Sequence, residues 1–356
     1  MALDFIDSCA HIGVGAGQIP LSRKWTAVSE AAIVTSPSRK SGFAIAIVAG
    51  ISKTLSYQSQ RTAGCAYYMP SSSAAALIMG FGSGGPNIAY LRIEADFTVS
   101  IYSGGNNVVI WNSGSVHKVI TADTFHYYEL KVILGGGAPI TVTATLYVDG
   151  NLWALSQTGN TAYNANQLLI NAAEMNQFFL GPASGGGNTG YACDIYVLNN
   201  QTVDLNGNTA TCTTFLGDVS ILALVPIADI NTNWGTFPGG APHSYALVDE
   251  IPPDDDTTYV FTPTLNEIEA FQFQQLVGFI GSIFGAQLLL YCKKDDEGSR
   301  TIEGIVGGTS QNNNYGLQQY LYDYYDYFIF PLDSDNGVTW TPAVYNAENF
   351  GAKLSG

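Results

Sequence analysis

The feature that most constrains the fold is a strict two-residue alternation of apolar and polar side chains over residues 140–148. Threonine and tyrosine occupy one face of this segment. The other face carries Ile140, Val142, Ala144, Leu146 and Val148. Asp149-Gly150 follows and supplies the two residues that a tight hairpin turn needs, and an apolar return segment begins at Leu152. The pattern predicts a β-hairpin that buries one face.

Comparable segments recur along the chain and are separated by clusters of Gly, Asn, Ser and Asp, whereas a sustained 3.6-residue period is absent. Short strands with frequent turns are typical of antiparallel sheets packed as a sandwich. The chain is therefore predicted to be all-β. The further predicted strands are 97–102, 108–111, 127–134, 177–180, 191–198, 218–225, 257–263, 268–276, 283–293, 301–306 and 327–331.

A length of 356 residues suits two domains, each with its own core. The apolar alternation lapses into Asn, Thr, Gly and Pro over residues 230–242 and resumes beyond them. We therefore expect a β-sandwich at 1–229, a linker at 230–242, and a smaller C-terminal β-rich assembly domain at 243–356.

Charged residues make up only 12% of the chain, and the formal net charge is −16. Because no basic stripe is present, nucleic-acid binding is not expected. No apolar run approaches the roughly 20 residues of a bilayer span, and no membrane insertion is expected. Acidic residues and no basic stretch open the chain, so we expect synthesis in a cytoplasm rather than secretion. A surface of Tyr, Ser, Gly and Asn suits interfaces, although an ordinary β-rich protein would share it.

The five cysteines show no C-x-x-C spacing, and their number is odd. They are interpreted as small buried apolar residues. A disulfide between Cys193 and Cys212 remains an alternative.

No catalytic pattern is found, because the four histidines are dispersed and no serine lies in a G-x-S-x-G turn. A carboxylate pair for glycoside cleavage would have to come from Glu94, Asp96, Glu129, Asp149, Glu174 and Asp194. The chain is therefore expected to be non-enzymatic, with neither cofactor nor metal. Residues 254–256 are all Asp and could hold calcium, but without a D-x-D-x-D-G loop a solvated turn is favoured.

Several segments, in order, resemble a family of phage virion proteins that carry a lectin-like or laminin-G-like domain. These segments are Phe5–His11 with Lys24-Trp25, Phe125–Val132, Phe215–Val219, Leu224–Asp229, Val248–Glu250, Asp255–Val260, Lys293–Arg300 and Trp340–Gly351. Departures from the family pattern occur at Cys9, Ala10 and Phe125, and they weaken the transfer of a binding site.

The resemblance implies a concanavalin A-like jelly-roll sandwich in a structural component of a tailed-phage virion. It does not distinguish a tail appendage, a fibre and a head decoration. Partners would be copies of the chain and other virion proteins, and the location would be the virion. No family-wide catalytic residues are implied.

Two other functions stay open beside particle assembly. One is a host-glycan lectin that binds through loops bearing Trp111, Trp153, Tyr163 and Asn164. The other, less favoured, is a polysaccharide depolymerase.

A tyrosine-rich run in the C-terminal part is expected to join copies into a homo-oligomer, and the resemblance to phage fibre proteins implies a trimer. Its members are Tyr320, Tyr322, Tyr324, Tyr325 and Tyr327. Closure of the C-terminal core is the rival explanation for the same residues.

Overall fold

A computed structural model describes residues 3–12, 21, 24–29, 31–39, 42–73, 75–83, 87–104, 108–135, 140–160, 174–181, 190–201, 215–310, 315–330 and 339–356. The chain forms two compact units. The sandwich unit comprises Asp4–Asn200 and Thr213–Leu222, and the C-terminal unit comprises Met1–Leu3, Gln201–Cys212 and Ala223–Gly356. Over the described ranges, no helix is long and apolar enough to cross a lipid bilayer.

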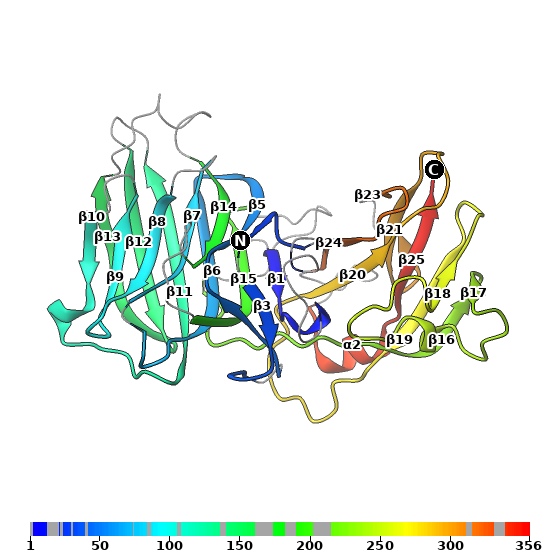
Figure 1. Cartoon of the computed structure of the whole chain (residues 1–356), viewed down its shortest axis with the longest axis horizontal. Helices are drawn as coiled ribbons and strands as arrows, with labels where there is room; N and C mark the ends of the chain where they lie inside the picture. Colours follow the sequence, from blue (N-terminus) through cyan, green and yellow to red (C-terminus); the bar gives the residue numbers. More distant parts are fainter. Residues whose placement is uncertain are drawn as a thin grey trace. The chain divides into compact units, whose positions relative to one another are not determined.

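The first sheet of the sandwich unit has the strand order β13-β12-β11-β6-β15-β4-β3, and β1 also pairs with β15 (Figure 1). All the pairings for which a register is resolved are antiparallel. The strands are β1 (Leu3–Asp7), β3 (Ala31–Val34), β4 (Ala44–Ile47), β6 (Gln60–Tyr68), β11 (Phe125–Gly135), β12 (Thr141–Val148), β13 (Asn151–Asn160) and β15 (Gly190–Asn199).

The second sheet has the order β10-β9-β8-β7-β14-β5-β2 and is also antiparallel. Apolar residues of both sheets belong to one core cluster, so the two sheets form a sandwich. The strands are β2 (Ala27–Val28), β5 (Ile51–Gln58), β7 (Ala76–Gly82), β8 (Asn87–Ile93), β9 (Val99–Ser103), β10 (Val108–Asn112) and β14 (Met175–Leu180).

The alternation at 140–148 is confirmed as a strand with one buried face. Leu146 is 0% exposed and Val148 is 1% exposed. Asp149 and Gly150 have φ angles of 50° and 72°, the left-handed conformations that the tight turn requires. The predicted hairpin of 97–102 with 108–111 is confirmed as β9 and β10.

The C-terminal unit is built from smaller sheets. Its main sheet runs β16-β19-β25-β21-β22 with β23 beside β21, and two further ribbons pair β17 with β18 and β20 with β24. These strands are β16 (Pro226–Thr232), β17 (Gly235–Phe237), β18 (Tyr259–Phe261), β19 (Ile268–Phe273), β20 (Ala286–Cys292), β21 (Thr301–Val306), β22 (Thr309–Ser310), β23 (Tyr315–Gly316), β24 (Asp323–Phe330) and β25 (Phe350–Ser355). The all-β prediction, with a jelly-roll sandwich followed by a smaller β-rich unit, is confirmed.

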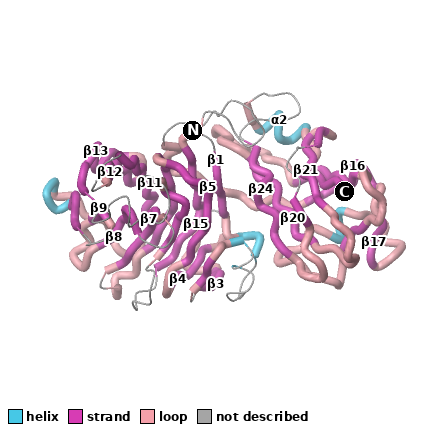
Figure 2. The backbone as a smooth tube through the Cα atoms, turned by 90° about the horizontal axis from the view of Figure 1, so that it is seen from above, coloured by secondary structure: helices cyan, strands magenta, loops and turns pink. Residues whose placement is uncertain are grey.

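Helices are few and short among the described residues, as the cyan segments of Figure 2 show. They are the 3-10 turns η1 (Ala10–Ile12), η2 (Ser113–Val116) and η3 (Tyr245–Leu247) and the helix α2 (Pro342–Ala347). The sequence carries a local signal for α2, because Thr341 caps its N-terminus and Pro342 stands at its first position.

The structure divides the chain at Leu222 and Ala223, earlier than the predicted linker. Residues 230–242 include the end of β16 and all of β17. Alternation lapses there because β16 is an edge strand of its sheet, with Ile227 and Ile230 exposed.

The prediction of a strand at 218–225 is wrong. Residues 218–225 join no sheet, and β16 begins only at Pro226. Within this segment the Ile221 amide donates to the Asp194 carboxylate of the first sheet instead of to a neighbouring strand, as described below.

Candidate functional site

The N-terminal motif forms a buried polar cluster in the sandwich unit. Trp25 Nε1 donates to Asp7 Oδ2 at 2.8 Å, and the Cys9 amide donates to Asp7 Oδ1 at 2.7 Å. Lys24 Nζ lies 3.7 Å from the same carboxylate. Burial would raise the pKa of Asp7, but Lys24, His11 and the two hydrogen bonds outweigh it and lower the pKa. Because the Asp7 carboxylate is enclosed by neighbouring residues of the protein, this cluster stabilises the fold.

Residues 215–221, here called the strap, cross the face of the first sheet that points away from the core. The amides of Leu216 and Gly217 both donate to Glu129 Oε1 on β11, each at 2.8 Å. The Tyr196 hydroxyl on β15 donates to the same oxygen. A buried carboxylate with three donors therefore fixes the first half of the strap.

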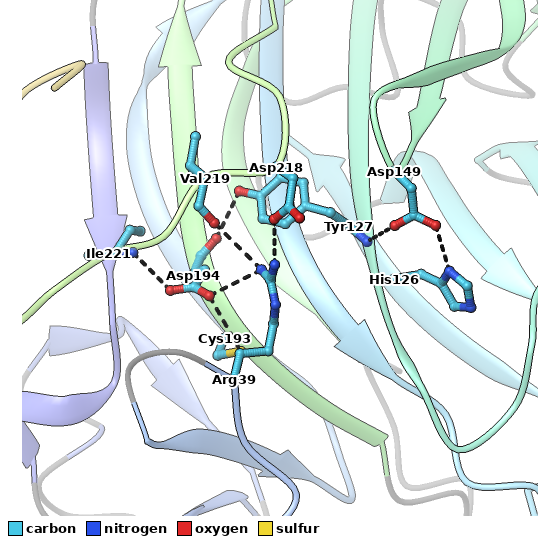
Figure 3. A network of polar contacts seen from close by, with 9 residues as sticks. All are labelled: Arg39, His126, Tyr127, Asp149, Cys193, Asp194, Asp218, Val219 and Ile221. Atoms are coloured by element: carbon cyan, nitrogen blue, oxygen red, sulfur yellow. Dashed lines mark hydrogen bonds and ion pairs between the residues drawn. The ribbon is translucent and has the colours of Figure 1, made fainter. Parts of the chain in front are cut away.

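The second half of the strap is held by the polar network in Figure 3. The Ile221 amide donates to Asp194 Oδ1 at 2.9 Å. Arg39 Nη1 lies 3.2 Å from Asp194 Oδ2, and Arg39 Nη2 lies 2.5 Å from Asp218 Oδ1. Arg39 thus joins a carboxylate of β15 to a carboxylate of the strap.

The positive charge of Arg39 is already offset within the protein. Burial would lower the pKa of Arg39, but the hydrogen bond to Asp218 and the charges of Asp194 and Asp218 outweigh it and raise the pKa. The guanidinium also lies 5.5 Å from the centre of the Tyr127 ring. Because Arg39 is shared between two carboxylates, the site presents no surplus positive charge.

His126 and Asp149 secure the β12–β13 turn (Figure 3). Their side chains meet at 2.7 Å between Nδ1 and Oδ2, and the Tyr127 amide donates to Asp149 Oδ1 at 2.8 Å. The hydrogen bond to Asp149 raises the pKa of His126 despite its partial burial.

A row of three aromatic rings lies beside the network. Phe125, Tyr68 and Tyr191 stand directly opposite one another on β11, β6 and β15. The Tyr68 ring centre lies 5.4 Å from that of Phe125 and 5.7 Å from that of Tyr191. All three rings are partly exposed, and the Tyr68 hydroxyl donates to Asp123 Oδ1 at 3.3 Å. We call these three residues the aromatic row.

The aromatic row is continuous with the polar network. Two residues further along the same strands lie Tyr127, Ala66 and Cys193, again directly opposite one another. Tyr127 contacts Arg39, and its hydroxyl donates to the Asp194 carbonyl at 2.9 Å. Aromatic rings, hydroxyls and an ion pair therefore adjoin on one face.

Of the four predicted glycan residues, the structure describes Trp111 and Trp153. Trp111 and Trp153 lie on the strands β10 and β13 rather than on loops, and both pack partly against the core. Lys118 Nζ lies 5.5 Å from the centre of the Trp153 ring. Tyr163 and Asn164 lie outside the described residues.

The candidate catalytic carboxylates are mostly engaged by their own chain. Glu129, Asp149 and Asp194 hold the strap and the turn, as described above. On the second sheet, the Tyr102 hydroxyl donates to Glu94 Oε1 at 2.7 Å. Asp96 accepts from the amide and hydroxyl of Thr98, and Glu174 precedes β14.

The tyrosine-rich run is divided between core and surface. Tyr324 and Tyr325 are buried, whereas Tyr320 is 68% exposed. Tyr322 stacks on Tyr291 with ring centres 4.9 Å apart. The side chain of Tyr327 lies outside what the structure describes.

The acids at 254–256 contact groups of the C-terminal unit. Asp254 accepts from the Thr258 amide and hydroxyl. Asp255 accepts from the Tyr291 hydroxyl, and Asp256 pairs with Lys293 at 2.6 Å.

Four of the five cysteines fall within the described residues, and all four are free thiols. Cys9, Cys65 and Cys193 are buried, as expected, and Cys292 is partly buried. Cys212 lies outside the described residues, and so does its proposed pairing with Cys193.

No protein-family model matches the chain, and no curated protein sequence matches it. Solved structures similar to it include a marine alginate lyase from Aplysia kurodai, with a TM-score of 0.41 and 11% identity, covering 56% of this chain and 100% of that one. A glucuronan lyase from Trichoderma reesei has a TM-score of 0.35 and 10% identity, with coverage of 56% and 97%. An alginate lyase from a Chlorella virus has a TM-score of 0.33 and 10% identity, with coverage of 49% and 93%.

These comparisons contradict the expectation of a non-enzymatic chain, because the similar structures are enzymes that act on polysaccharides. The expectation treated the lack of a familiar sequence motif as a lack of catalysis, and that step does not hold. At this identity the similarity concerns the fold, so neither their activity nor their substrates are transferred here.

Proposed function

We propose that the sandwich unit binds a polysaccharide on the outer face of its first sheet, along the aromatic row. The observation that carries the proposal is the contiguous placement of Phe125, Tyr68 and Tyr191 on three adjacent strands. The C–H faces of sugar rings pack against aromatic rings, and a line of such rings suits an extended chain better than a single small molecule.

Polar groups beside the aromatic row have the chemistry for sugar hydroxyls. The Asp218 side chain, which belongs to the polar network, is 49% exposed. The Asp123 carboxylate accepts a hydrogen bond from the Tyr68 hydroxyl of the aromatic row. Carboxylates accept hydrogen bonds from hydroxyls, and such bonds to a charged acceptor are strong. The strap keeps Asp218 in place, so little ordering is required on binding.

The electrostatics favour a neutral polysaccharide over an acidic one. Arg39 is balanced by Asp194 and Asp218, and the whole chain carries a formal charge of −16. A uronate polymer would meet the carboxylates of Asp218 and Asp123 beside the aromatic row, and Arg39, the cation of the described network, is already paired with two carboxylates. In this respect we expect the ligand to differ from the substrates named for the similar lyases.

The proposal is tested by titrating neutral and acidic polysaccharides into the full chain by calorimetry. Tyr68→Ala and Tyr191→Ala should each weaken binding at least about tenfold, which corresponds to about 1.4 kcal/mol. Tyr57→Ala is the matched control, because Tyr57 is 40% exposed on the second sheet and away from the aromatic row. Equal affinity for all three variants would refute the site. Reducing-end release in the same samples tests cleavage separately.

We further propose, from the sequence resemblance alone, that this recognition serves a tailed-phage particle that contacts a host surface. Mass spectrometry of purified particles tests the location. If the chain is absent from particles, the proposal of a phage location is wrong. The saccharide site is tested independently by the titrations.

A further inference from the structure

The loop between β19 and β20 exposes large apolar side chains to an unusual extent. Ile280 is 98% exposed, Val277 is 85% exposed and Phe279 is 39% exposed. In Figure 1 this connection, drawn in gold, projects beyond the strands that it joins. Contiguous apolar groups on the surface of a soluble chain mark contact sites.

The loop is held at its base by its own unit. The Leu276 amide donates to Asn346 Oδ1 of α2 at 2.8 Å, and Leu276 and Ile283 pack against the C-terminal core cluster. A tight turn follows, in which the Val277 amide donates to the Gln275 carbonyl and Gly278 adopts a φ of +72°. These contacts fix the base of the loop on the C-terminal unit. Residues 276–281, here called the apolar tip, lie beyond the base, and 277–281 are exposed.

The tip lies in the middle of a long uncharged segment. No Asp, Glu, Lys or Arg occurs between Glu269 and Lys293. The exposed polar side chains next to the tip are neutral, namely Gln274, Gln275 and Ser282. A contact made here needs no opposite charge on the partner.

We propose that residues 276–281, the apolar tip, are a self-association surface that packs against the same tip of a second copy of this chain about a rotation axis. An isologous contact requires a surface that complements itself, and an apolar tip with neutral polar neighbours meets that requirement. Two chains of formal charge −16 repel each other except where they approach through uncharged surface.

The same charges make a lipid surface the less favoured occupant. Cytoplasmic membrane surfaces are negative and attract loops that carry Lys or Arg, and this loop carries neither. The tip alone is smaller than the roughly 800 Å² per partner of a stable interface, so the association should be weak, with Kd near the micromolar range, on the order of 1–100 μM.

Sedimentation equilibrium of the full chain over about 1–100 μM tests the proposal. The wild type should show concentration-dependent association, and Ile280→Asp should shift its Kd at least about tenfold toward monomer with an unchanged circular dichroism spectrum. Val119→Asp is the control, because Val119 is 61% exposed in the sandwich unit. A monomeric wild type, or equal association of wild type and Ile280→Asp, would overturn the proposal.

A second measurement covers the case in which Ile280→Asp does not fold. Ile280→Cys treated with a short bis-maleimide should give a cross-linked dimer, whereas Val119→Cys should not. Equal cross-linking of the two variants counts against the tip. Flotation of a monomeric wild type with phosphatidylcholine vesicles, lost in Ile280→Ser, would assign the tip to lipid and overturn self-association.

Discussion

The two units of this chain use their apolar residues differently. The sandwich unit gathers residues of both sheets into one extensive core cluster, whereas the main core cluster of the C-terminal unit is far smaller. Exposed large apolar residues occur in both units, but the two most exposed, Ile280 and Val277, belong to the C-terminal unit. The comparison indicates that the sandwich stabilises itself, while the second unit keeps apolar surface available for contacts.

Buried carboxylates occur in both units. In the sandwich unit, the buried carboxylates of Glu129 and Asp194 are occupied by the strap. In the C-terminal unit, Glu269 is 1% exposed, and its Oε1 has no hydrogen-bond partner among the described residues. Burial raises the pKa of Glu269, with the nearby charge of Asp229 adding to the effect. Buried side-chain atoms of this kind occur in both units, so the two units are alike in this respect.

The largest expected effect is in the sandwich core. Leu146→Asp places a charge without a partner in a position that is 0% exposed, which should cost more than about 4 kcal/mol of unfolding free energy. Leu155→Asp is the matched control, because Leu155 is 62% exposed on the neighbouring strand β13. Urea denaturation measures both. A soluble, native-like Leu146→Asp protein would contradict the assignment of position 146 to the sandwich core.

The strap provides the next test. Glu129→Ala leaves the amides of Leu216 and Gly217 without their acceptor, so about 3 kcal/mol of stability should be lost. Limited proteolysis should then cut within residues 215–221, where the wild type resists. Glu297→Ala, on an exposed residue of the C-terminal unit, should change neither result.

The fate of the strap shows where sequence reasoning fails. Two-residue alternation identified the face of 140–148 because strand geometry alone fixes it. The same kind of pattern at 218–225 did not produce a strand, because its partners are the side chains of Arg39 and Asp194, which are remote in the sequence. No local signal announces such partners.

The aromatic row escaped the sequence for a similar reason. Tyr68, Phe125 and Tyr191 are separated by many residues, and each stands at or near the end of its strand. Period-two alternation gives the face of each residue but not the register between strands. The doublet Tyr67-Tyr68 was a usable hint, since neighbouring residues on a strand point to opposite faces, and one ring of the pair must leave the core.

Acidification should weaken the sandwich unit through the N-terminal cluster. Burial, with the charge of Lys24 adding to it, lowers the pKa of His11 to about 3. The unfolded chain binds this proton near pH 6.5 and the folded chain does not, so the contribution is full above pH 6.5 and is lost as pH falls toward 3. Between pH 7 and pH 4 the loss should reach about 3 kcal/mol.

His11→Asn removes this titration and serves as the comparison. The variant should lose less stability than the wild type between pH 7 and pH 4, measured by urea denaturation at both values. His126 acts in the opposite direction, because its raised pKa favours the folded state at low pH, and it is common to both proteins. Identical losses in the two proteins would exclude His11 as the source.

The smallest expected effect tests whether the two units unfold separately. Thr341 Oγ1 accepts from the Val344 amide at 3.1 Å and so caps α2 in the C-terminal unit. Thr341→Ala should cost about 1 kcal/mol, and Thr341→Ser, which keeps the hydroxyl, should cost much less. Because α2 also supplies Asn346 to the base of the apolar tip, the loss belongs to the C-terminal unit. Calorimetry should show a lowered transition for that unit with the sandwich transition unmoved, since the two cores are distinct clusters. A single transition that shifts as a whole would mean that the two units unfold together, so that the stability of the C-terminal core depends on that of the sandwich core.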